Sequence, residues 1–397
     1  MHAQMRDADA LTPLPYHQAI VTHLKAAEPD VWAWASSLRV QAAHAADARA
    51  QLLRDTYRLT PATHPAVYAA AALACERLGI DAPVTLYQAG ASTMNAALYY
   101  LPGEVHVVLQ GAILERLNDA ELLAVLGHEF AHYRLWSRDA GDYLAADRIL
   151  NHSDDVAATP ASYVESARLY ALHTELYADR GAALAAGDSA AAISTLVKVH
   201  TGIAVVDATA YLQQALELDD THARRSAGVS HPETYLRSQA VDMWWQADPG
   251  LDDWLRRRLH GPLALHGLDL TGQVTLTAIT RGLITHFLQA DNVRVEKTLA
   301  QARAYFPDWT LGDPPLDPAT LTADLVDPSA ADYLHYVMLD LALCDGDVRD
   351  AALARALRIA RAWDGADALT HILKRDLKMN KRQLDKLTRS SAEANHA

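Results

Sequence analysis

Two histidines and one glutamate lie within a short apolar stretch, LLAVLGHEFAHYRLW, from Leu122 to Trp136. Burying an ionisable side chain there is costly unless a partner compensates it. On a helix, His128 and His132 are four residues apart and share a face, so both imidazoles could bind one Zn²⁺. Glu129 points about 100° away from His128 and can reach water activated at the ion without being a ligand. This H-E-x-x-H pattern predicts a zinc site; the alternative is two core histidines bonded to backbone carbonyls.

A catalytic zinc ion usually has three protein ligands and one open position, so a third ligand is required. The stretch HTELYADRGA places Glu175 and Asp179 four residues apart on one helical face. Alone, such a pair is more typical of a solvated helix. Beside the histidine pair, Glu175 is predicted as the third ligand. Asp179 is predicted to accept the second N–H of a ligand histidine and so fix its tautomer.

The predicted ligands need two long helices to hold them. The first is predicted to begin after Asn118, because Asn118 and Glu121 form a capping-box pattern. The second is predicted after Thr159, with Pro160 in its first turn. Before these helices, residues 82–90 and 103–111 are β-branched and bounded by glycines, which indicates strands, with a third strand between them.

Several motifs occur in an order that resembles the M48 family of zinc metallopeptidases, a branch of the gluzincins. The resemblance extends from about Val84 to Arg237. The stretches that carry it are NAALYYLPGEVHVVLQGAILERLNDAELLAVLGHEFAH, ELYAD and SHPETYLR. It implies that His128, His132 and Glu175 bind one Zn²⁺ per chain. It also implies that Glu129 is the general base through which activated water attacks a peptide carbonyl.

The resemblance also assigns residues around the metal. His231 is predicted to stabilise the oxyanion, although a His-Pro pair is more often a turn. Arg237 is predicted to orient Glu175 or Asp179. Asn95 and Ala96 are predicted to line the substrate cleft beside a strand edge, where an extended peptide could pair with the backbone.

The expected fold class is α+β, mostly α-helical, with a gluzincin-type metallopeptidase domain built around a small mixed β-sheet. Residues 1–80 are expected to form a helical region packed on the catalytic domain, 81–255 the M48-like domain, and 256–397 a helical accessory domain. The stretch LALCDGDVRDAALARALRIARAWDG resembles, more weakly, the TerB-like helical domains of tellurite-resistance proteins. A plain helical domain that binds a protein partner is the alternative there.

The amino-acid composition limits the classes of partner that the protein is expected to bind. A formal charge of −14 disfavours nucleic acid. Two cysteines exclude a disulfide framework and a four-cysteine zinc site. The acidic, proline-containing N-terminus lacks the pattern of a signal peptide, and the sequence lacks the run of about 18 apolar residues that an integral membrane segment needs. We therefore expect a cytoplasmic protein whose partner is a protein or peptide substrate.

The leading hypothesis is a soluble zinc-dependent endopeptidase. One alternative is a scaffold or binding protein that keeps zinc for folding or recognition; Glu129 argues against it, because a structural site needs no base. Another is a latent protease whose cleft is covered by residues 137–158 or by the C-terminal half.

Overall fold

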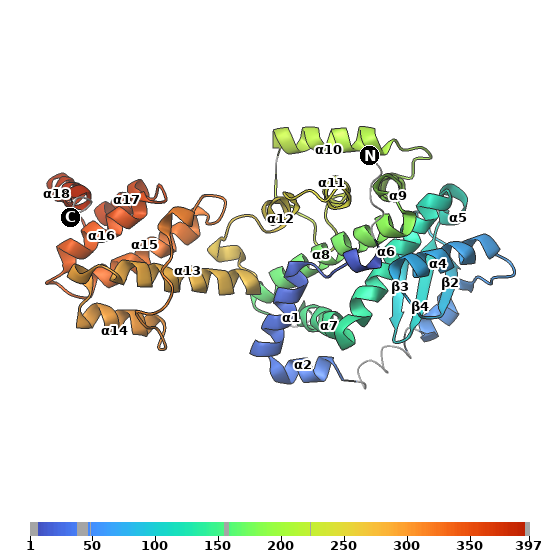
Figure 1. Cartoon of the computed structure of the whole chain (residues 1–397), viewed down its shortest axis with the longest axis horizontal. Helices are drawn as coiled ribbons and strands as arrows, with labels where there is room; N and C mark the ends of the chain where they lie inside the picture. Colours follow the sequence, from blue (N-terminus) through green and yellow to red (C-terminus); the bar gives the residue numbers. More distant parts are fainter. Residues whose placement is uncertain (1–6, 38–46, 48, 155–158, 223, 394–397) are drawn as a thin grey trace. The chain divides into compact units, whose positions relative to one another are not determined.

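The computed structural model describes residues 7–37, 47, 49–154, 159–222 and 224–393 (Figure 1). The chain divides into two compact units, an N-terminal unit, Met1–His260, and a C-terminal unit, Gly261–Ala397. The predicted ligands all lie in the N-terminal unit. Its helices are α1 (Pro15–Ala27), α2 (Pro29–Ala35), α4 (Pro65–Leu78), α5 (Ile113–Arg116), α6 (Asp119–Ser137), α7 (Asp142–Asp154), α8 (Ala161–Ala186), α9 (Ser189–Thr201), α10 (Ala208–His222), α11 (Thr234–Trp245) and α12 (Leu251–Leu255).

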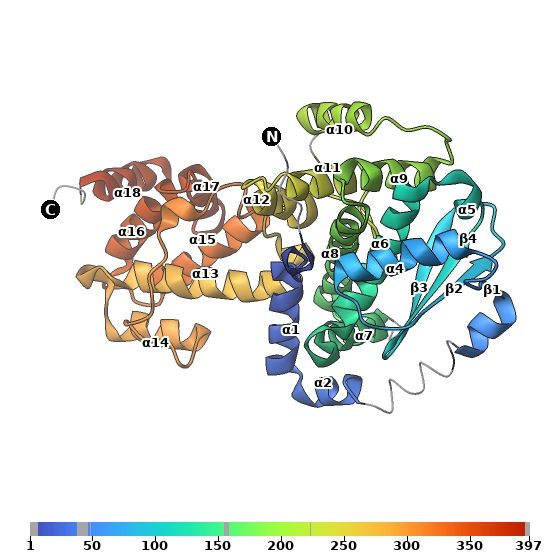
Figure 2. The same ribbon diagram turned by 45° about the vertical axis from the view of Figure 1, so that its right-hand side comes forward.

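A small mixed sheet lies beside these helices (Figure 2). Its strands are β1 (Tyr57–Arg58), β2 (Val84–Ala89), β3 (Asn95–Leu101) and β4 (Glu104–Gln110), in the order β1-β2-β4-β3. β2 and β4 are parallel, whereas β3 pairs antiparallel with β4 and forms the edge of the sheet. α6 packs on β3 and β4, which places the helix beside this edge strand. The predicted α+β, mostly helical fold is confirmed.

The central helix α6 begins where its sequence predicts. The Asn118 side chain accepts from the backbone N–H of Glu121 at 3.0 Å, and the Glu121 carboxylate accepts from the backbone N–H of Asn118 at 3.0 Å. These contacts satisfy two N–H groups that the helix cannot pair internally. Glu121 is also buried and ion-paired with Lys198 of α9 at 2.8 Å, so the start of α6 is fixed to the neighbouring helix.

Two glycines let α6 and α8 approach closely. A Cβ placed on Gly127 would lie 2.2 Å from the Ala185 Cβ, and one on Gly181 would lie 2.3 Å from the Ala131 Cβ. Any larger residue at either position would push the helices apart. The small residues therefore set the separation at which side chains from α6 and α8 can meet.

Residues 142–154 form the helix α7. Prolines stand at two other helix starts. Pro29 begins α2 after Glu28, which separates α2 from α1. α8 begins at Ala161, with Pro160 as its N-cap rather than in its first turn.

The C-terminal unit is helical. Its core is formed largely by the three helices at residues 270–288, 328–343 and 349–361. Phe287, Trp309 and Met338 are among its most deeply buried side chains. The Trp309 indole N–H donates to Thr285 at 2.9 Å, so the large ring is buried without an unpaired polar atom. The helices are α13 (Leu270–Leu288), α14 (Glu296–Tyr305), α15 (Pro328–Leu343), α16 (Arg349–Arg361), α17 (Ala366–Asp376) and α18 (Lys381–Glu393).

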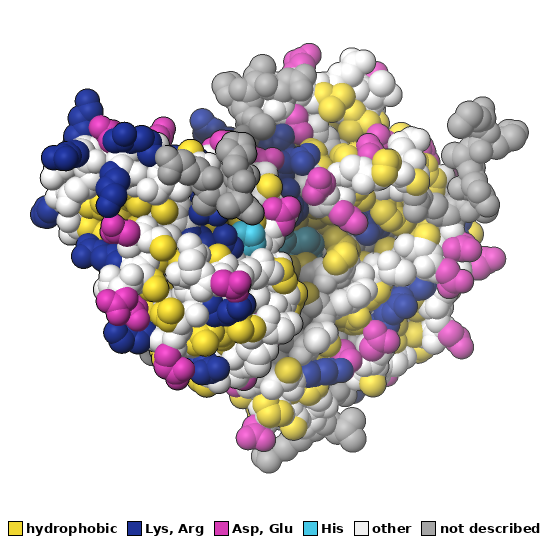
Figure 3. Space-filling view, turned by 60° about the vertical axis from the view of Figure 1, so that its left-hand side comes forward, with side chains coloured by type: hydrophobic (Ala, Val, Ile, Leu, Met, Phe, Trp, Pro, Cys, Tyr) yellow, Lys and Arg dark blue, Asp and Glu magenta, His cyan; other side chains and the backbone are white. Residues whose placement is uncertain are grey.

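The described helices include none that combines the length and the apolar character needed to cross a bilayer. Acidic and basic side chains are interspersed over the face shown in Figure 3, with hydrophobic side chains scattered between them.

Candidate metal centre

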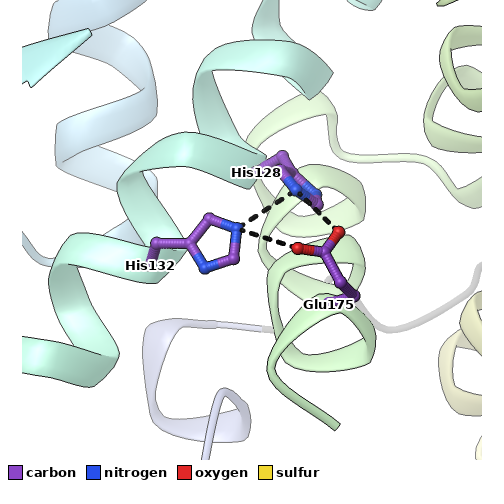
Figure 4. Close-up of side chains that lie close together, drawn as sticks. All are labelled: His128, His132 and Glu175. Atoms are coloured by element: carbon purple, nitrogen blue, oxygen red, sulfur yellow. Dashed lines mark hydrogen bonds and ion pairs between the residues drawn. The ribbon is translucent and has the colours of Figure 1, made fainter. Parts of the chain in front are cut away.

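Three side chains predicted as ligands lie together between α6 and α8 (Figure 4). The Nε2 atoms of His128 and His132 are 3.2 Å apart. The Glu175 carboxylate faces both rings, with one oxygen 3.5 Å from the His128 Nε2 and the other 3.7 Å from the His132 Nε2. One donor atom from each residue lies within 4.8 Å of the other two, which suits a single bound cation.

The Asp179 carboxylate and the Arg237 guanidinium contact the three predicted ligands and fix their orientation. Asp179, one turn beyond Glu175 on α8, lies with its Oδ1 3.2 Å from the His128 Nδ1. Arg237 of α11 donates to both Asp179 oxygens, at 2.8 and 2.7 Å, and its Nη2 lies 3.1 Å from the Glu175 Oε2. Because the His128 Nδ1–H is directed to Asp179, the Nε2 lone pair is left facing Glu175 and His132.

Burial and neighbouring charges shift the pKa values of all three predicted ligands. Burial opposes protonation of His128, but the Asp179 and Glu175 carboxylates outweigh it and raise its pKa to about 10. Burial and the neighbouring His128 lower the pKa of His132 to about 4. Burial acts against ionised Glu175, yet Arg237 and His128 hold its pKa well below the ordinary value. The site is thus built to keep carboxylates ionised around a positive charge.

Glu129 stands apart from these ligands on α6. It is 7% exposed, and burial raises its pKa to about 7. Its carboxylate accepts a hydrogen bond from the backbone of Leu98, in the edge strand β3. Glu129 therefore lies between the three predicted ligands and the strand, with a pKa near neutrality.

The cluster opens into a cleft of about 970 Å³, the volume of a site for a peptide segment. Asn95 and Ala96, predicted as cleft residues, line it from β3. His231 lines it from the opposite side, with its Nε2 3.5 Å from Glu175 and its Nδ1 2.8 Å from the Ser230 Oγ. The His231 side chain is 58% exposed, so it can meet a molecule entering the cleft.

Comparison with known proteins agrees with this geometry. Residues 69–245 match the sequence model of peptidase family M48. This region is therefore similar to the M48 metallopeptidases. The predicted family resemblance is confirmed, whereas the weaker TerB-like resemblance of the C-terminal unit stays a prediction.

Two relatives share parts of the M48 region. The chain is 28% identical to the plastoglobule-localized metallopeptidase 48 of Arabidopsis thaliana over 190 residues, which are 43% of this chain and 54% of that protein. It is 48% identical to the CAAX prenyl protease 1 homolog of Dictyostelium discoideum over 42 residues, 11% of this chain and 10% of that protein. The chain thus spans about half the length of the first relative, or less. No solved structure matches significantly.

Two further histidines of the M48-like region, His106 and His173, are buried. His106 of β4 lies between the Tyr87 hydroxyl, at 3.1 Å, and the Glu104 carboxylate, at 2.8 Å. His173 of α8 is 5% exposed and contacts His260, with 2.9 Å between their Nε2 atoms. Each of the two histidines has a partner on another element, Tyr87 of β2 for His106 and His260 for His173, which a local pattern cannot identify.

The M48 cleft also contains residues that the sequence motifs did not single out. Trp136 follows His132 by one helical turn, and Asp147 and Asn151 line the cleft from α7. The signal for Trp136 was its i+4 spacing from His132, which puts both on one helical face. Asp147 and Asn151 share the same spacing, but their stretch indicates a loop or a short helix, and from that pattern no common face is inferred.

Proposed function

We propose that this protein is a zinc-dependent endopeptidase in which His128, His132 and Glu175 hold the ion and Glu129 is the general base. The observation that carries the proposal is the convergence of two imidazoles and one carboxylate from α6 and α8, with Glu129 beside them. Similarity to the M48 family supports the same chemistry.

The residues present fit a zinc ion. Two imidazoles and a carboxylate are a donor set typical of catalytic zinc. The two Nε2 atoms are 3.2 Å apart and the Glu175 oxygens lie 3.5 and 3.7 Å from them, so one cation between them could contact all three side chains. When bound, zinc would supply a Lewis acid that polarises the substrate carbonyl and acidifies water.

Proton movement is assigned to Glu129. With a pKa near 7, its carboxylate can take a proton from the attacking water and pass it to the leaving amine as the peptide bond breaks. The Leu98 backbone bond orients the carboxylate towards the cleft. His231, exposed in the cleft on the far side of Glu175, is proposed to stabilise the developing oxyanion.

Substrate binding is assigned to the edge strand β3. Its outer edge, opposite β4, borders the cleft through residues 95–98. An extended peptide can add to such an edge by backbone hydrogen bonds, which do not require a particular sequence. Because an edge accepts a segment from the middle of a chain as well as an end, this favours cleavage within polypeptides.

The direct test compares the wild type with Glu129→Gln on an unfolded protein substrate such as casein. We expect cleavage by the wild type and a kcat lower by about 10²–10⁴-fold in the variant, because an amide cannot accept the proton. Zinc content should be unchanged, since Glu129 is not a ligand. Equal inertness of both proteins, each with zinc bound, would instead support the scaffold hypothesis.

A further inference from the structure

The cleft contains a carboxylate to which the proposed mechanism gives no role. Asp147, on α7, lines the cleft, as do Asn151 on the same helix and Trp136 of α6. α7 packs against both α6 and α8, so its cleft-facing side chains are held on a rigid element. Asp147 is partly buried, and desolvation raises its pKa to about 6.

The other carboxylates of the cleft are already engaged. Glu175 and Asp179 contact His128 and Arg237, and Glu129 accepts from the Leu98 backbone. Glu233 accepts from the Ser226 hydroxyl at 2.7 Å and from the Ala227 N–H at 2.9 Å. Each has a partner that explains why an ionised group is retained there.

Asp147 differs because none of the described residues forms an ion pair with it, although the nearby charge of Arg148 acts to lower its pKa. Asn151, one turn later on α7, hydrogen-bonds to its side chain and orients it. The adjacent Arg148 directs its guanidinium to the Ala35 carbonyl, at 3.2 Å. A carboxylate buried without a counter-ion is costly, and the cost is relieved when a cation enters.

Trp136 adds a second unsatisfied group in the same cleft. Its indole N–H is buried and makes no hydrogen bond to any described residue. Its ring contacts His132, with centroids 5.6 Å apart, which places it next to the proposed metal ligands. An indole is the ring that attracts a cation most strongly, and its N–H can donate to a backbone carbonyl.

We propose that Trp136, Asp147 and Asn151 form a subsite that binds a lysine or arginine side chain of the substrate. The basic side chain lies along the Trp136 indole and pairs with the Asp147 carboxylate. Asn151 is a positioning residue that orients this carboxylate. The inference rests on the proposed peptidase function and narrows it to substrates with a basic residue at one fixed position relative to the cleaved bond.

A peptide-library digest tests the subsite. The wild type should cleave peptides with lysine or arginine enriched at a single position, and Asp147→Asn should remove the enrichment. For a matched pair of peptides carrying lysine or norleucine there, kcat/KM for the lysine peptide should fall by about 30-fold or more, because an unpaired charge is then desolvated. The kcat/KM for the norleucine peptide should fall much less, so the ratio of the two values reports the loss of the basic preference.

A charge reversal and a matched control complete the test. Asp147→Lys should shift the preference to glutamate or aspartate at the same position. Asp142→Asn removes a carboxylate from the same helix, where it pairs with Lys25, and should leave the preference unchanged. Cleavage with no basic preference, or a preference that Asp147→Asn retains, overturns the subsite while leaving the peptidase proposal intact. No cleavage of any peptide overturns the peptidase proposal itself.

Discussion

Two clusters of buried histidines lie along α8, and they have opposite electrostatic character. The first contains His128 and His132 with the Glu175 and Asp179 carboxylates. The second contains His17, His173 and His260, packed among aromatic rings such as Tyr16. Carboxylates raise the pKa of His128 to about 10, whereas burial lowers that of His17 to about 3.

Hydrogen bonding explains why His17 of the second cluster stays neutral. The His17 Nδ1 accepts from the Leu14 backbone N–H at 3.2 Å, and its Nε2 faces the Thr174 Oγ at 3.2 Å. The Thr174 hydroxyl donates its proton to the Tyr170 carbonyl. The Thr174 oxygen must therefore accept the hydrogen bond from the His17 Nε2–H. One neutral tautomer satisfies every bond, and a second proton would meet the Leu14 N–H. Burial of histidines therefore does not by itself make a metal centre; facing carboxylates distinguish the first cluster.

The largest effect expected from this contrast is on acid stability. The pKa of His17 is 6.5 in the unfolded chain and about 3 in the folded protein. The contribution of neutral His17 to the free energy of unfolding is therefore complete above pH 6.5 and is lost as the pH falls towards 3. By pH 4 the loss should be about 3 kcal/mol. Urea unfolding of the full chain from pH 7.5 to 4 should show a shallower decline for His17→Gln than for the wild type.

The control for acid stability is His152→Gln, which removes an exposed histidine of α7. Its pH dependence should follow that of the wild type. Parallel curves for the wild type and His17→Gln would contradict the neutral assignment of the second cluster.

A smaller effect is expected from separating the helices that bring the first cluster together. Gly181→Ala introduces a Cβ 2.3 Å from that of Ala131, so α6 and α8 must move apart. We expect a loss of about 1–3 kcal/mol in the free energy of unfolding, with weaker zinc binding. Gly90→Ala, where a Cβ would meet nothing within 4 Å, is the matched control. Unchanged zinc affinity in Gly181→Ala would show that helix separation does not set the geometry of the cluster.

The smallest of these effects concerns the partner of His128. Asp179→Asn removes the charge that stabilises the Nδ1–H of His128 and should weaken zinc binding by about 10–100-fold. Competition with a chelator measures this change. Glu165→Gln alters an ion-paired carboxylate on the same helix, beside Arg168, and should bind zinc like the wild type. Equal affinities in both variants would mean that Asp179 does not tune the metal.

The sequence predicted features that depend on local spacing. The capping box at Asn118 located the start of α6, and the four-residue spacings placed His128 with His132 and Glu175 with Asp179 on common faces. The sequence did not predict contacts between segments that are far apart in the chain. The close approach at Gly127 and Gly181 and the burial of His173 against His260 depend on how helices pack, for which one sequence offers no period or spacing.

The central claim is that facing carboxylates direct one zinc ion to the first histidine cluster rather than the second. Anomalous diffraction at the zinc edge, on crystals of the purified full chain, tests it most directly. We expect a single zinc peak in bonding contact with His128, His132 and Glu175. A peak between His173 and His260, or none anywhere after the protein is soaked with zinc, would contradict it.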